Sequence, residues 1–216
     1  MIQIPKVYRT EKYLNIANFW PLSEVVGPGK RAIIWLQGCL KRCKECITPE
    51  MQPIESKMWI KVETISKFIA SIKNIEGITI YGGEPILQFM ALSHLFENLK
   101  KSGLTTMLYT GYYYEELLNY PHPLMKNLLN NTDILVDGPY IPELDHGEMW
   151  RGSSNQRIIF LSEIYKDWEW VINEKKREIE IRISKNGKFV ILGIPPKNLY
   201  PILFTNWKGG IKNAKE

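Results

Sequence analysis

Cysteine and histidine are scarce in this sequence of 216 residues, which contains three of each. An odd number of cysteines argues against a framework of disulfide bonds. No apolar run approaches the roughly 18 residues that a membrane span needs. The first thirteen residues, MIQIPKVYRTEKY, lack the apolar stretch of a secretory signal. We therefore expect a cytoplasmic protein that does not interact with a membrane.

The charge of the chain is weakly positive, with a formal net charge of +5. Much of the excess lies in the last third of the sequence, but no long unbroken basic block occurs there. Such a distribution is typical of a solvated surface, so binding of nucleic acid is not expected. Hydrophobic residues make up 44% of the chain, which is enough for a sizeable core.

Strand-like and helix-like segments alternate through the first 160 residues. The expected strands are residues 31–37, 78–81, 105–110 and 133–137, and the expected helices are residues 61–73, 85–100 and one that opens with 114–118. This alternation predicts an α/β fold with a mostly parallel sheet and helices packed outside it.

A different pattern follows residue 160. Residues 178–184 alternate charged and apolar side chains, and residues 189–194 form a second strand-like run. Asn186 and Gly187 between them suit a two-residue hairpin turn. We therefore expect a core domain over residues 1–160 and an appendage over residues 161–216 that contains a β-hairpin.

All three cysteines lie close together, as Cys39, Cys43 and Cys46, in the loop after the first expected strand. Three thiolates at this spacing can converge on one metal centre, and the chain has no further cysteine to complete a four-cysteine cluster. A 4Fe–4S cluster held here would keep one iron open to a small molecule. The cations between the cysteines would offset the negative charge of the thiolates; they are Lys41, Arg42 and Lys44.

The competing prediction is a zinc ion held by the three cysteines and one histidine. The histidines are His94, His122 and His146, and all of them are far from the cysteines along the chain. None lies at a usual zinc-ligand spacing, so the cluster is favoured.

Further candidate binding residues lie at or directly after the ends of the other expected strands, where the loops of a parallel sheet gather. Gly82 and Gly83 would let a ligand approach the backbone closely, and Glu84 could accept hydrogen bonds from an ammonium group. Thr110 and Asp137 are the last residues of the next two expected strands. The structural alternatives are a strand-to-helix turn at Gly82–Glu84, a helix cap at Thr110 and an Asp-Gly turn at Asp137.

Several ordered motifs over residues 26–157 resemble the radical S-adenosylmethionine superfamily. The stretches that carry the resemblance are VGPGKR at 26–31, QGCLKRCKEC at 37–46, YGGEP at 81–85, YTGY at 109–112, DGPY at 137–140 and RGSSNQR at 151–157. Within the superfamily, the chain is most similar to the activating enzymes of glycyl-radical enzymes, especially the activating proteins of anaerobic ribonucleotide reductases.

The resemblance implies a partial (β/α) barrel with a 4Fe–4S cluster on Cys39, Cys43 and Cys46. It implies an oxidoreductase that cleaves S-adenosylmethionine into methionine and a 5′-deoxyadenosyl radical. That radical would abstract a hydrogen atom from a glycine of a partner enzyme, with a flavodoxin or ferredoxin as electron donor. Family members bind the amino group of the cofactor at the segment that corresponds to residues 82–84, and Thr110 and Asp137 would bind other parts of it. The resemblance also implies a flexible cationic loop at 27–31, and a stretch at 151–157 that lines the mouth of the barrel.

Two departures from the family pattern leave the substrate open. The residues between the last two cysteines are Lys44 and Glu45, and the expected hairpin exceeds a minimal activating protein. One alternative is therefore a radical enzyme that modifies a peptide or a small molecule. Another is a non-catalytic interaction module that binds an iron–sulfur cluster or zinc.

Overall fold

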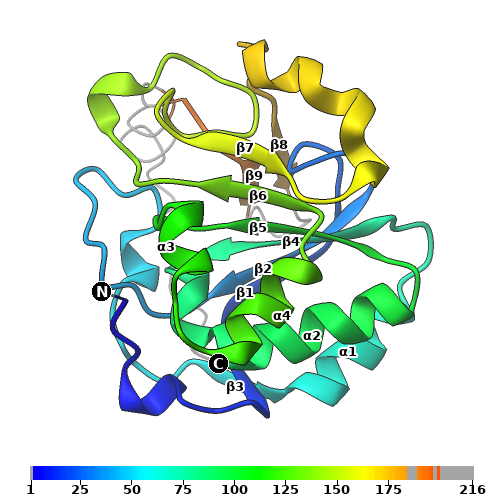
Figure 1. Cartoon of the computed structure of the whole chain (residues 1–216). Coiled ribbons are helices and arrows are strands. Elements are labelled where there is room, and N and C mark those ends of the chain that lie inside the picture. Colours follow the sequence, from blue (N-terminus) through cyan, green and yellow to red (C-terminus); the bar gives the residue numbers. More distant parts are fainter. Residues whose placement is uncertain (1, 184–188, 197–198, 200–216) are drawn as a thin grey trace.

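The computed structural model describes residues 2–183, 189–196 and 199. Its main feature is a seven-stranded sheet with the strand order β3-β1-β2-β4-β5-β6-β7, accompanied by a separate two-stranded sheet, β8-β9 (Figure 1). The strands are β1 Tyr13–Ser23, β2 Arg31–Leu36, β3 Met58–Lys61, β4 Gly77–Gly82, β5 Thr105–Tyr109, β6 Ile134–Asp137, β7 Arg157–Phe160, β8 Ile179–Ile183 and β9 Phe189–Gly193. The α-helices are α1 Val62–Ala70, α2 Phe89–Lys101, α3 Tyr114–Leu118 and α4 Pro123–Asn130. Short 3-10 helices are η1 Lys6–Tyr8, η2 Pro49–Met51, η3 Pro85–Gln88 and η4 Pro142–Leu144, and a longer one is η5 Glu163–Asn173.

The sheet is mixed rather than mostly parallel. The pairs β2–β4, β4–β5 and β5–β6 are parallel, whereas β1–β2, β1–β3 and β6–β7 are antiparallel. The predicted α/β class is confirmed, but the prediction of a mostly parallel sheet holds only for the four central strands. The short connection between β1 and β2 accounts for the antiparallel pairing of these two strands, since a parallel pair needs a long crossover. The partial barrel stays a prediction, because the strand order ends at two different edges, β3 and β7.

The two faces of the central strands pack against different neighbours because successive side chains of a strand point to opposite sides. In β2, Ile34 and Leu36 face the helices, whereas Ile33 and Trp35 face the other side; all four are buried. The whole strand is buried for this reason, as its uninterrupted apolar sequence predicts.

Helices α1, α2 and α4 cover the first face and lie next to one another (Figure 1). The predicted helical spacing in residues 61–73 is confirmed, with Ile65 and Ile69 buried in α1. The predicted helix from Pro85 begins as the 3-10 helix η3, and the α-helix itself starts at Phe89. No helix in the described part of the chain is long and apolar enough to cross a membrane.

The second face is covered by segments from the last third of the chain. Leu192 of β9 is fully buried in the same apolar cluster as Trp35, and Val171 of η5 is fully buried in the same cluster as Val136. The two predicted hairpin strands are confirmed as an antiparallel pair. Their predicted turn, with Asn186 and Gly187, lies outside the described residues. The domain boundary near residue 160 stays a prediction.

Arg31 lies at the start of β2, at the opposite end of the strand from Cys39, and is fully buried. Its guanidinium donates to Oγ1 of Thr79 at 2.9 Å, to the carbonyl of Ile78 at 2.7 Å and to Oγ1 of Thr105 at 3.0 Å. These bonds join the ends of three neighbouring strands. The expectation of a flexible cationic loop is therefore wrong for this arginine, which is a fixed core group.

Candidate functional site

One pocket at the carboxyl ends of β2, β4 and β5 collects nearly all of the predicted site residues. We call it the cysteine pocket. The predicted residues that line it are Cys39, Cys43, Cys46, Gly82, Gly83, Glu84 and Thr110. Asp137 is the one predicted site residue that is not among its lining residues.

The loop that carries the cysteines leaves β2 and is closed at its base by backbone hydrogen bonds. The amide of Gly38 donates to the carbonyl of Met51 at 2.8 Å, and the amide of Cys39 donates to Gln52 at 2.9 Å. Within the loop, Arg42 and Glu45 have positive φ angles of 51° and 55°. These left-handed residues turn the chain tightly, so the cysteines stay within one short loop.

All three thiols are free, and none forms a disulfide. Burial raises the pKa of Cys39 to about 11, and it also raises the pKa of Cys43. The three thiols share the pocket, but no three Cys, His, Asp or Glu side chains of the described residues are already gathered as a metal-ligand set. Their donor chemistry nevertheless fits an iron–sulfur cluster, because three free thiols line one wall of a single pocket.

The histidines do not support a zinc site with these cysteines. None of the three lines the cysteine pocket. His94 contacts Glu11 at 3.1 Å, and the ring of His122 accepts a hydrogen bond from the amide of Leu124 at the start of α4. The fourth ligand that a zinc ion would take from a histidine is therefore not provided at this place.

The two glycines after β4 bring their loop against the base of the cysteine loop. Gly82 has a φ of 122°, and a Cβ atom there would overlap the backbone of Leu36. A Cβ on Gly83 would overlap the carbonyl oxygen of Gly38. The amide of Gly83 donates to Leu36 at 2.8 Å, and the amide of Glu84 donates to Gly38 at 2.8 Å. Packing of the two loops therefore already requires both glycines, in addition to any ligand.

Glu84 is a fixed carboxylate in the pocket wall, with only 2% of its surface exposed. Its Oε1 accepts hydrogen bonds from the amide of Ile86 at 3.0 Å and from the hydroxyl of Thr110 at 2.8 Å. Its Oε2 accepts from the amide of Gly111 at 2.8 Å. Burial raises the pKa of Glu84, while these hydrogen bonds act in the opposite direction. The side chain is thus held in one orientation before any ligand arrives.

Asp137 has partners within the protein instead. Its carboxylate accepts from the amide of Tyr114 at 2.7 Å, which starts α3, and from Nε of Arg157 at 2.9 Å. Arg157 also pairs with the exposed Glu115 at 2.8 Å. The carboxylate of Asp137 is fully buried. Its predicted role in cofactor binding stays a prediction.

Sequence reasoning missed several residues of the pocket wall. They are Tyr81, Tyr109, Tyr140 and Ile194; Lys41, which was expected only to offset the charge of the thiolates, lines the pocket as well. The stretch 151–157, expected at the mouth, does contribute Gly152 and Gln156. The side-chain Nε2 of Gln156 donates to the carbonyl of Gly138 at 2.9 Å and so joins two of the loops.

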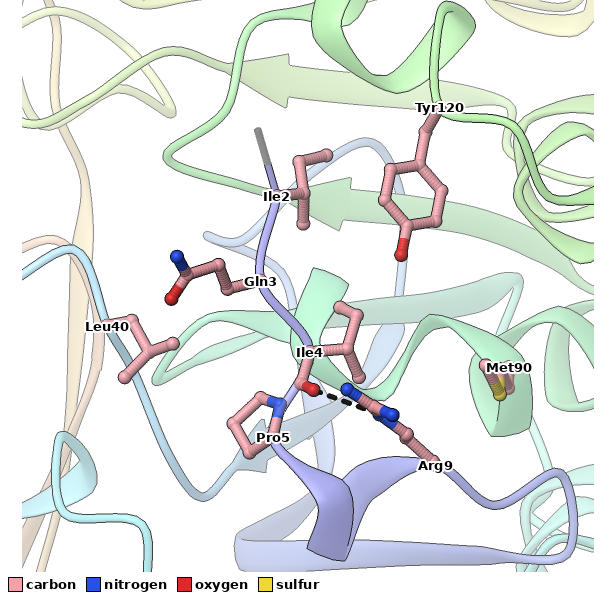
Figure 2. Close-up of a pocket in the computed structure, with 8 residues that line it drawn as sticks. All are labelled: Ile2, Gln3, Ile4, Pro5, Arg9, Leu40, Met90 and Tyr120. Carbon is pink, nitrogen blue, oxygen red and sulfur yellow. Dashed lines mark hydrogen bonds between the residues drawn. The ribbon is translucent and has the colours of Figure 1, made fainter.

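A second pocket lies on the outer side of the cysteine loop (Figure 2). It is formed mainly by the N-terminal segment, and its lining residues are Ile2, Gln3, Ile4, Pro5, Arg9, Leu40, Met90 and Tyr120. Arg9, the one charged side chain among the described residues that line it, donates to the carbonyl of Ile4 at 3.2 Å. None of the predicted site residues lines this pocket, so the cysteine pocket is the candidate functional site.

Fold and site together define an α/β protein that presents three thiols and a glycine-rich loop where its parallel strands end. The chain belongs to the family described as the 4Fe-4S single cluster domain, which matches residues 25–159. An anaerobic ribonucleoside-triphosphate reductase-activating protein of Vibrio cholerae is 32% identical over 154 residues, which are 67% of this chain and 97% of that protein. Proteins of the same name from Enterobacteria phage T4 and Salmonella typhi are 26% and 30% identical, each over 151 residues. These residues are 67% and 65% of this chain, and 93% and 95% of the two relatives.

Proposed function

We propose that this chain is a radical S-adenosylmethionine enzyme that activates an anaerobic ribonucleotide reductase by forming a glycyl radical on it. The observation that carries the proposal is the shared pocket of the three cysteines and the Gly82–Glu84 loop. The family match and the names of the relatives support it.

In this proposal Cys39, Cys43 and Cys46 hold a 4Fe–4S cluster. A cluster bound there would supply the electron for reductive cleavage of the carbon–sulfur bond of S-adenosylmethionine, with methionine and, after transfer of a hydrogen atom from a glycine of the reductase, 5′-deoxyadenosine as products. A cytoplasmic flavodoxin or ferredoxin would provide the electron.

The protein's own contribution is to orient the cofactor and to limit its contact with water. Glu84 can accept a hydrogen bond from the amino group of the cofactor through Oε2, because that oxygen accepts one hydrogen bond within the protein whereas Oε1 already accepts two. Gly82 and Gly83 leave backbone groups accessible beside it. The aromatic rings of Tyr81 and Tyr109 pack edge to face, with their centroids 5.4 Å apart, and form an apolar floor of the cysteine pocket.

The proposed architecture is a partial (β/α) barrel whose inner face carries the rings of Tyr81 and Tyr109. The burial of every residue of β2 supports it, since this strand is covered on both faces as in a barrel wall. In this proposal, Thr110 and Asp137 also contribute to binding of the cofactor. The contacts of Thr110 place it as a support for Glu84.

The test is an anaerobic assay of the reconstituted protein with S-adenosylmethionine and dithionite. We expect methionine and 5′-deoxyadenosine in equal amounts, and neither from a Cys43→Ala variant. With the reductase added, we expect the doublet of a glycyl radical in the electron paramagnetic resonance spectrum. Absence of both cleavage products from iron-loaded wild-type protein would overturn the proposal.

A second candidate is modification of a peptide or small molecule by the same chemistry. It is favoured by Ile194, which lines the cysteine pocket although it lies beyond the region matched by the family. Cleavage of the cofactor without any glycyl radical on the reductase would support this candidate.

A further inference from the structure

The cations of the cysteine loop point to different surroundings. Arg42 and Lys44 are exposed, and their side chains contact Gln52 at 3.3 Å and Glu143 at 3.4 Å. Lys41 is half-buried and lines the cysteine pocket. The loop therefore sends one of its cations toward the site and leaves the other two on the surface.

Inside the pocket, Lys41 is held by contacts other than an ion pair. Its Nζ lies 3.5 Å from the centroid of the Tyr112 ring, which is a cation–π arrangement. Its methylene groups pass beside Gly111. Among the described residues, no carboxylate lies within ion-pair distance of its ammonium group. A cation placed in this way has donors left for an anionic ligand.

The charges of the pocket wall form a matched pair. Lys41 is the one Lys, Arg or His in the described wall, and Glu84 is the one Asp or Glu. Gly111 lies between them, since its amide donates to Glu84 and the aliphatic stem of Lys41 packs against its open side. One positive and one negative group on neighbouring parts of a wall complement the two charges of an α-amino acid.

We propose that Lys41 binds the α-carboxylate of the methionyl part of S-adenosylmethionine while Glu84 receives its α-ammonium group. The assignment rests on the proposed function and adds a cofactor-binding residue to it. Because Lys41 and the cysteines share one short loop, cofactor and cluster would be positioned by the same backbone. The competing role for Lys41 is to offset the charge of the cluster, a role that Lys44 in the same loop would share.

The experiment compares two ligands on three proteins. Wild type, Lys41→Met and the control Lys44→Met are loaded with iron and sulfide, and the cluster is kept oxidised so that no cleavage occurs. Equilibrium dialysis then gives the dissociation constants of S-adenosylmethionine and of decarboxylated S-adenosylmethionine, which lacks the carboxylate. Iron content and circular dichroism show that each variant is folded and loaded.

We expect Lys41→Met to weaken binding of S-adenosylmethionine by about tenfold or more, as loss of a charge-assisted hydrogen bond implies. Binding of the decarboxylated compound should change less than threefold, and Lys44→Met should leave both constants unchanged. Equal weakening of both ligands by Lys41→Met, or no weakening of either, would overturn the assignment. Failure of the loaded wild-type protein to bind S-adenosylmethionine would overturn the proposed function itself.

Discussion

The hydroxyl of Thr110 donates a 2.8 Å hydrogen bond to Oε1 of Glu84 and so joins the end of β5 to the loop that follows β4. Both residues are buried. The amide of Tyr112 in turn donates to the hydroxyl of Thr110 at 3.1 Å. Thr110 is thus both donor and acceptor in a short chain of bonds that fixes one wall of the cysteine pocket.

Replacing Thr110 with valine should lower the free energy of unfolding by about 1–3 kcal/mol, because a buried carboxylate oxygen and a buried amide each lose a partner. Urea denaturation followed by circular dichroism measures this loss. The control is Thr64→Val on the exposed side of α1, which should change the stability by less than about 0.5 kcal/mol. Equal effects of the two substitutions would contradict the role given to Thr110.

The pH dependence of stability should carry a contribution from Glu84. Burial raises its pKa above the ordinary 4.5, so above that value the folded state holds a proton that the unfolded state has lost. The contribution of Glu84 to stability is therefore fully present below pH 4.5 and is lost as the pH rises through the folded-state pKa.

The variant Glu84→Gln isolates this contribution, since glutamine does not titrate. We expect the stability of wild type relative to Glu84→Gln to fall as the pH is raised from about 4.5 toward neutrality. Denaturant melts of the metal-free protein at several pH values measure the difference. A difference that stays constant over this range, or rises with pH, would show that hydrogen bonding to Glu84 outweighs its burial.

The sequence identifies the central part of the fold because the local patterns there agree with the tertiary structure. Strands β2, β4, β5 and β6 are apolar runs bounded by turn residues, and the fold buries them as such. The sequence did not predict strand β1. It contains Asn18 and Pro21, its pairing with β2 is irregular, and several of its residues are exposed. Proline and polar residues of this kind are tolerated near a sheet edge but hide the strand in the sequence.

The candidate site likewise contains features that the sequence predicts and features that it does not. The cysteine spacing is a local property of the sequence, so it suffices to predict that the three thiols share one loop. The partner of Asp137 is Arg157, on an antiparallel strand that was not predicted, so the sequence alone could not show that this carboxylate is already paired. The direction of Lys41 and the position of Ile194 depend on loop conformation and on packing of the hairpin, which no local pattern specifies.

Gly83→Ala should disturb the cysteine loop. The new Cβ would overlap the carbonyl oxygen of Gly38, which is backbone and cannot rotate away. We expect a lower free energy of unfolding and less bound iron per folded chain after reconstitution. The control is Gly103→Ala, where the space is open but φ is positive at 78°. It should cost about 1 kcal/mol through backbone strain and leave iron content unchanged.

Arg31→Met should lower the free energy of unfolding by about 3 kcal/mol or more, because several buried acceptors lose their donor at once. The substitution lies at the end of β2 remote from the cysteines, so the folded fraction should still bind iron. The control Arg182→Met removes an exposed arginine that pairs with Glu180 at 2.9 Å. It should change stability by less than about 1 kcal/mol.

The hairpin should shield the cysteine pocket from solvent. Leu192 is fully buried in the same apolar cluster as Trp35, and Ile194, two residues later, lines the pocket. Leu192→Asp would place a carboxylate without a partner in this apolar cluster, so the hairpin should separate from β2. We expect a red shift of tryptophan fluorescence and faster removal of cluster iron by a chelator.

The matched control for the hairpin is Ile183→Asp in β8, because Ile183 is 72% exposed. It should leave both signals unchanged, because a charge at this position remains in water. If chelation is equally fast in wild type and Leu192→Asp while the fluorescence shifts, the hairpin packs on the sheet without covering the pocket. Since the family match ends at residue 159, shielding by the hairpin would be a property of this chain that lies outside the matched region.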